Sequence, residues 1–248
     1  MSVDRYILSL SDNSMILGHR LSELCGHGPT LETDIALTNI SLDFFGQVRG
    51  FLSVLASRQG GDVTEDTLAF LRREREHLNC ILVELPNTDF AHVIVRQYLF
   101  DVFHKLQLEL LEKSTDVDIA AIATKSLKEA KYHERFSRSW MLRLGDGTEV
   151  SHAKMQTAIN VLYPYVHELF ELTDWEHELI VSGIAADTDQ IKAQYYTTLN
   201  ATLSEANLTV EGLTNRYAKG KSGMHTENLG FILTEFQYMQ RAYPQMQW

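Results

Sequence analysis

The scarcity of chain-breaking residues is the feature that most constrains the fold of this chain. The sequence contains 14 glycines and 4 prolines among 248 residues. Together they make up about 7% of the chain, compared with about 12% in typical soluble proteins. Sandwiches, barrels and propellers need a turn after every short strand, so this sequence does not suit them. It predicts long, uninterrupted elements.

Apolar residues recur at helical spacing through most of the chain, and Gly or Pro follows several of the predicted helix ends. The predicted helices cover residues 6–24, 31–59, 64–85, 89–113, 116–144, 149–172, 188–206 and 226–241. Pro164 should kink or divide the helix over 149–172. A capping box at Thr173 and Glu176 predicts a further short helix that ends near Gly183. No strand pattern, internal repeat or low-complexity linker is present.

Four of these helices are long, about 33 to 44 Å at 1.5 Å per residue. Their connections are short, so neighbouring helices should pack antiparallel. We therefore predict an all-α fold, a ferritin-like long antiparallel four-helix bundle with additional N- and C-terminal helices. It forms a single domain over 1–248, with the core bundle at about 31–144 and a C-terminal helical extension at about 149–248. Gly46 and Gly50 lie inside the second helix, where we expect another helix to pack closely.

Charge and composition exclude several classes of partner. The chain has 22 basic and 33 acidic residues, a net charge of −11, which does not favour nucleic acid or an anionic membrane surface. No apolar run approaches the 18 or so residues of a membrane span, and the first residues lack the pattern of a signal peptide. Cys25 and Cys80 make no disulfide framework. We expect a cytoplasmic protein with reduced thiols.

Ferritin-like bundles often hold a di-iron or di-manganese site, which demands a carboxylate from each of two helices and Glu-x-x-His from each of the other two. Glu74 and His77 form one such motif in the sequence. The second should lie near Glu129, but Tyr132 is at i+3 and His133 at i+4. A histidine at i+4 is displaced by about 100° around the helix from the required position. The residues therefore indicate a partial, defective metal site.

Carboxylates on apolar stretches are costly to bury unless they are paired or bind a metal. Asp34, Asp43 and Asp101 are of this kind, and they are either metal ligands or members of buried salt bridges. We favour salt bridges because the fifth helix lacks its histidine in register. Arg49, Lys105 and Lys128 are the candidate partners.

No nucleophile elbow, Gly-rich phosphate loop or Cys-x-x-Cys motif is present. The loop 219–223 is basic and matches no phosphate-loop pattern, so we interpret it as an ordinary solvated loop rather than a phosphate contact. We predict no catalytic residue and no metal ligand in this chain. The candidates for a degenerate site, which should pair with Arg, Lys, His or water, are Asp43, Glu74, Asp101, Glu129 and His133.

Several sequence blocks, in order along the whole chain, carry a family resemblance. They cover residues 36–49, 66–70, 84–87, 96–98, 128–133, 135–138, 225–230 and 235–238, and the chain closes on Trp248. On these blocks the chain resembles the non-catalytic ferritin-like subunits of bacterial phenylacetyl-CoA 1,2-epoxidases. These are multicomponent monooxygenases of aerobic phenylacetate degradation.

The resemblance implies a structural role without an active site in this chain. The implied partner is a homologous catalytic subunit that holds the di-iron centre, which this chain stabilises in a hetero-oligomer. A small accessory subunit and a reductase with FAD and an iron–sulfur cluster complete the complex and deliver electrons from NADPH. The implied reaction inserts one oxygen atom of O2 across the ring of phenylacetyl-CoA. A homodimer is an alternative assembly for the isolated chain.

A degenerate bundle can present a long helical surface to a similar bundle. Our candidates for that interface are apolar residues of the first two helices, although they could equally fill the core of this chain: Tyr6, Leu10, Leu17, Leu21, Phe44 and Phe51. Two other functions stay open. One is an active di-iron oxygenase subunit that uses Glu74/His77 and Glu129/His133 with Asp34 and Asp101. The other is a free-standing helical binding protein.

Overall fold

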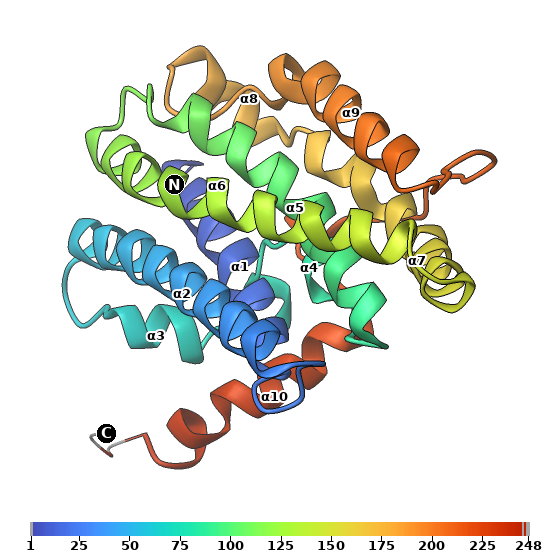
Figure 1. Ribbon diagram of the computed structural model, residues 1–248. Helices are drawn as coiled ribbons and strands as arrows, with labels where there is room; N and C mark the ends of the chain where they lie inside the picture. Colours follow the sequence, from blue (N-terminus) through green and yellow to red (C-terminus); the bar gives the residue numbers. More distant parts are fainter. Residues whose placement is uncertain (1, 245, 247–248) are drawn as a thin grey trace.

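The computed structural model describes residues 2–244 and 246, and helices dominate it (Figure 1). Its α-helices are α1 (Ser2–Ser22), α2 (Leu31–Gln59), α3 (Glu65–Phe70), α4 (Ile81–Glu84), α5 (Phe90–Leu111), α6 (Val117–Gly145), α7 (Glu149–Leu162), α8 (Asp174–Val181), α9 (Thr188–Glu205) and α10 (Glu227–Ala242). Three 3₁₀ helices are η1 (Glu74–Glu76), η2 (Tyr163–Phe170) and η3 (Gly220–Ser222). The part of the chain that is described contains no strand, which confirms the all-α prediction.

Most predicted helices are confirmed, including the division at Pro164. The α-helical geometry of α7 ends at Leu162, and Pro164 lies in the first turn of η2. Proline has no N–H to donate to the next hydrogen bond of an α-helix. In the first turn of a new helix no such donor is needed, so the α-helix ends and a 3₁₀ helix begins here. The capping box of Thr173 and Glu176 is also present at the start of α8.

The bundle consists of α1, α2, α6 and α5 (Figure 1). Ser22 at the end of α1 is hydrogen-bonded to Ser41 in the first half of α2, so these helices are antiparallel. Arg58 near the end of α2 meets Asp116, which caps the start of α6. Helices α5 and α6 are antiparallel as well. It follows that α2 and α5 run in the same direction, and the chain between them must cross the length of the bundle.

This crossover corrects the prediction of a long helix over residues 64–85 within a bundle at 31–144. Helix α1 is a bundle member instead, and the crossover segment forms only short helices joined by extended chain. The cause is tertiary. The backbone N–H of Leu78 donates to Asp12 Oδ2 at 2.8 Å, and that of Cys80 donates to Asn13 Oδ1 at 2.8 Å. Because side chains of α1 take these N–H groups, the segment does not need a helix to satisfy them.

The C-terminal elements cover the outside of the bundle. Helices α7 and α9 pack against α5, and α10 lies across α1, α3 and α4 (Figure 1). No helix in the described residues is both long and apolar enough to span a membrane.

The apolar residues that we predicted as an interface lie in the core of this chain. Each of the six is at most 6% exposed: Tyr6, Leu10, Leu17, Leu21, Phe44 and Phe51. The structure thus corrects the expectation of an exposed face there. Burial of each such side chain contributes about 1.5–3 kcal/mol to folding, so they stabilise the bundle itself.

Candidate functional site in the centre of the bundle

Four of the five predicted site residues meet in the middle of the bundle. Asp43 comes from α2, Asp101 from α5, and Glu129 and His133 from α6. Antiparallel packing of these helices brings their midpoints together, which is why residues far apart in the sequence share one region. Glu74 is not among them, because η1 holds it at the exposed surface of the crossover.

The remaining carboxylate and histidine candidates lie elsewhere. His77 is fully buried but follows η1 in extended chain, so Glu74 and His77 do not share a helix face. Asp34, near the start of α2, accepts the backbone N–H groups of Gly26 and Gly28 at 3.0 and 2.9 Å. These bonds lower its pKa and fasten the loop between α1 and α2. Neither His77 nor Asp34 contributes to the bundle centre.

Asp43 and His133 form a direct pair. His133 Nε2 donates to Asp43 Oδ2 at 2.9 Å, and the imidazole is completely buried while the carboxylate reaches partly to solvent. Glu129 lies half-buried one turn before His133. Burial raises the pKa of Glu129, and the negative charge of Asp43 adds to this effect. The i+4 spacing therefore aims His133 at a carboxylate of α2.

Asp101 is bonded to neutral groups rather than to a cation. Gln97 Nε2 donates to one carboxylate oxygen at 2.6 Å and Ser137 Oγ donates to the other at 2.7 Å. Burial raises the pKa of Asp101 to about 7, although nearby His133 acts in the opposite direction. A substantial fraction of this carboxyl group is therefore protonated at neutral pH.

The expected salt-bridge partners are engaged elsewhere. Lys105 Nζ is 2.6 Å from Glu134 Oε2, and Arg49 is 3.7 Å from Glu65 at the surface. The prediction that Lys105 and Arg49 pair with the buried aspartates is therefore wrong. The lysine and arginine stems are long enough to reach partners nearer solvent, where ionisation costs less.

His104 of α5 is the second buried histidine of the centre. Its Nε2 donates to Gln47 Oε1 at 2.9 Å, and burial lowers its pKa to about 3, so the ring is neutral at pH 7. Phe44 packs against both imidazoles, with ring centroids 5.8 Å from His104 and 5.1 Å from His133. An aromatic ring thus fills space beside both histidines.

These residues do not fit a di-iron centre. Each of the two histidines and two aspartates is already hydrogen-bonded within the cluster, although Nδ1 of His133 has no hydrogen-bond partner. Helix α1 contributes Ser14 rather than a carboxylate. Among residues 2–244 and 246, no group of three or more His, Cys, Asp or Glu side chains is arranged to hold a metal ion. That this chain binds no metal stays a prediction.

Sequence reasoning missed the neutral members of this cluster, which are Gln47, Gln97 and Ser137. Each is buried on the same side of its helix as a charged or titratable member of the cluster. Their signal in the sequence was spacing, because Gln47 and Gln97 are each four residues from an aspartate of the cluster. Residues four apart lie on the same helix face, so an amide there can solvate a buried carboxyl group.

A second buried network joins the crossover to the C-terminal region. Glu84 Oε2 accepts from His225 Nδ1 at 2.8 Å and from Asn79 Nδ2 at 2.9 Å. Its other oxygen, Oε1, accepts the backbone N–H of Thr226 at 2.7 Å. His225 Nε2 donates to the carbonyl oxygen of His77 at 2.8 Å. Because both ring nitrogens face acceptors, His225 is an imidazolium, and its pairing with Glu84 raises its pKa against the effect of burial.

We expect the stability that His225 contributes to depend on pH. A histidine whose pKa is raised on folding stabilises fully below its unfolded pKa, about 6.5, and loses this contribution as pH rises through the folded pKa. The difference in unfolding free energy between the wild type and His225→Asn should therefore shrink by about 1–3 kcal/mol from pH 6 to alkaline pH. Urea unfolding of both proteins across that range measures it. A difference that grows with pH would contradict the imidazolium assignment.

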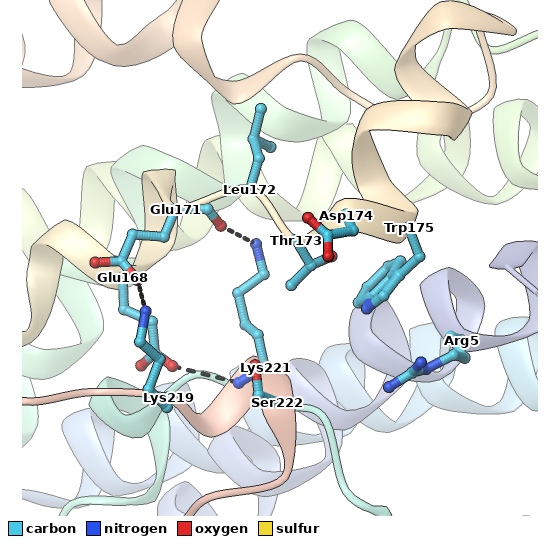
Figure 2. Close-up of a pocket in the computed structure, with 10 residues that line it drawn as sticks. All are labelled: Arg5, Glu168, Glu171, Leu172, Thr173, Asp174, Trp175, Lys219, Lys221 and Ser222. Carbon is cyan, nitrogen blue, oxygen red and sulfur yellow. Dashed lines mark hydrogen bonds and ion pairs between the residues drawn. The ribbon is translucent and has the colours of Figure 1, made fainter.

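The basic loop 219–223 borders a cavity of about 300 Å³ between η2, α8 and α1 (Figure 2). Its two lysines face acidic partners. Lys219 Nζ lies 2.8 Å from Glu171 Oε2, and Lys221 Nζ lies 2.8 Å from Glu176 Oε1. A Cβ on Gly220 would lie only 2.2 Å from the carbonyl oxygen of Asn79, so the loop is packed against the crossover. It is therefore a docked structural loop, not the solvated loop that we predicted.

The long bundle with a polar centre places this chain in the ferritin-like class of helical proteins. Comparison with known proteins identifies a family within this class. The chain belongs to the phenylacetic acid catabolic protein family, whose model matches residues 2–248. It is 47% identical over 243 residues to one of the subunits of the 1,2-phenylacetyl-CoA epoxidase of Escherichia coli (strain K12), an alignment that covers 98% of both chains.

Proposed function

We propose that this chain is a structural, non-catalytic subunit of a phenylacetyl-CoA 1,2-epoxidase, located in the cytoplasm. The 47% identity to the Escherichia coli epoxidase subunit over nearly the whole of both chains carries the proposal. At this identity the two proteins share their fold, so the same assembly role is expected. The name of that relative also implies that other subunits exist.

The arrangement of the bundle centre supports a structural rather than a catalytic role. A di-iron oxygenase needs ionised carboxylates and histidines with free nitrogens aimed at two metal positions. Here His104 donates to an amide and His133 to Asp43, while Asp101 is bonded to Gln97 and Ser137. Side-chain pairs between the helices hold them in register, which is what a supporting subunit requires.

The proposed partner is a homologous ferritin-like subunit that carries the di-iron centre and performs the ring epoxidation. A small accessory subunit and a reductase with FAD and an iron–sulfur cluster would pass electrons from NADPH to that partner. This chain itself would bind none of these cofactors.

Reconstitution of the complex tests the proposal. We expect the catalytic subunit to lose most of its epoxidation activity when this chain is omitted. A complex that contains the Asp43→Asn/Glu129→Gln variant of this chain should keep its turnover within about twofold, because the proposal places the chemistry in the partner subunit. Both positions are partly open to solvent, so the variant should fold.

Two other outcomes would point to the other functions. Loss of turnover by about 100-fold or more in the folded variant would indicate that this chain carries its own active site. Full epoxidation by the other subunits alone, with no binding to this chain, would indicate a free-standing protein.

A further inference from the structure

Helix α2 carries large apolar side chains on its outer surface. Leu31, Ile35 and Leu42 are all more than half exposed, and they lie on one side of the helix together with half-buried Phe45. Gly46 follows on this side, and a Cβ there would meet no atom within 4 Å. We expected another helix to pack at Gly46, but none of the helices within residues 2–244 does so. Gly50, by contrast, faces Ile122 of α6.

An apolar groove opens beside this stripe. It has a volume of about 510 Å³ and lies between α1, α2 and α3. Its lining is predominantly apolar and includes Met15, Phe45, Val48, Leu52 and Phe70. A groove of this size accepts one or two large apolar side chains.

Helix α10 extends the same surface. His19 of α1 stacks on Phe236 of α10 at 4.1 Å and meets the edge of Phe45 at 4.9 Å, so α2 and α10 are joined through one ring. Met239 of α10, three residues after Phe236, is exposed. Figure 1 shows α2, α3 and α10 along the same lower side of the molecule. We call this surface, made of Leu42, Phe45, Phe70 and Met239 with the groove, the α2–α10 face.

The rim of this face is acidic on balance, although Arg49 of α2 also lines the groove and pairs with Glu65. Segments 60–71 and 226–244 together contain five carboxylates and one basic residue, Arg241. Arg241 donates to backbone carbonyl groups of the crossover and is not free to neutralise the rim. Within the described part of the chain, neither Asp66 nor Glu235 has an ion pair. A partner that covers the apolar centre must therefore bring positive charge to its edge.

We propose that the α2–α10 face binds a helix of the homologous ferritin-like partner subunit, which seats a large apolar side chain in the groove and places Lys or Arg beside Asp66 and Glu235. This inference rests on the proposed function, because it names the surface through which the supporting role is exerted. Gly46 lets the backbone of the partner helix approach α2 closely.

Binding of the full-length chain to the purified partner subunit, measured by calorimetry, tests the inference. The variant Leu42→Glu/Met239→Glu should weaken binding at least about tenfold, because it puts charge into the apolar centre of the interface. The control Val150→Glu/Val181→Glu changes valines of α7 and α8 that are more exposed still, and it should bind like the wild type. Circular dichroism checks that each variant is folded.

A charge reversal tests the rim separately. Salt should weaken binding of the wild type, and Asp66→Lys/Glu235→Lys should weaken it several-fold while reducing its salt dependence. If the wild type binds the partner and the face variants bind equally well, the inference is wrong and the proposed function stands. If the wild type does not bind the partner at all, the proposed function fails and the inference fails with it.

Discussion

Replacement of Arg72 by methionine should lower the free energy of unfolding by about 3–5 kcal/mol. The Arg72 guanidinium forms two hydrogen bonds with the carboxylate of Asp12, which is completely buried in α1. The arginine holds the pKa of Asp12 below its ordinary value against the effect of burial. Without it, the protein must bury an uncompensated negative charge or protonate the carboxyl group.

Urea unfolding at neutral pH measures this effect, and Arg49→Met is the control. Arg49 is largely exposed and 3.7 Å from Glu65, so its loss should cost less than about 1 kcal/mol. The double variant Asp12→Asn/Arg72→Met should recover part of the stability lost in Arg72→Met, since it removes the buried charge. Equal destabilisation in the single and double variants would show that the unpaired carboxylate is not the cause.

Replacement of Glu84 by glutamine should destabilise the protein by a similar amount, about 3–5 kcal/mol. The carboxylate of Glu84 accepts from His225, from Asn79 and from both the backbone and the hydroxyl of Thr226. An amide of the same shape has one acceptor oxygen, so its NH₂ group would face donors and the imidazolium would lose its counterion.

This change should act first on α10, because Thr226 caps that helix. Hydrogen exchange of the amides in α10 should become faster in Glu84→Gln than exchange in α2 or α6. Glu205→Gln is the control, since Glu205 and Arg138 form an exposed pair whose loss should cost less than about 1 kcal/mol. Unchanged protection of α10 in Glu84→Gln would mean that this network does not hold the C-terminal region.

The sequence allowed prediction of the helices that local pattern controls. Helices α2, α5 and α6 have continuous apolar stripes and clear stop signals, and their bounds were predicted to within two residues. The stretch 64–85 has a helical pattern too, but Asp12 and Asn13 of α1 bind its backbone. Nothing within the stretch itself reveals acceptors that lie more than 60 residues away.

The position of the candidate site could be predicted in part, because local pattern determines the helices that carry it. The midpoints of antiparallel helices of known length must meet, so Asp43, Asp101 and His133 could be placed in one region from the sequence. Their hydrogen-bond partners could not, because the choice between a lysine, a histidine and an amide depends on rotamers and on distance to solvent. Glu84 and His225 gave no local signal, since they lie 141 residues apart.

Side-chain pairs hold the bundle centre of this chain, and on the proposed function the chain supports the epoxidation rather than performs it. The most direct measurement is the iron content of this chain and of its partner, separated from a complex loaded anaerobically with Fe(II), together with O2-dependent turnover of each. We predict iron and the capacity for turnover with the partner, and far less than one iron on this chain. About two irons per copy of this chain, with O2-dependent turnover by this chain alone, would contradict the account.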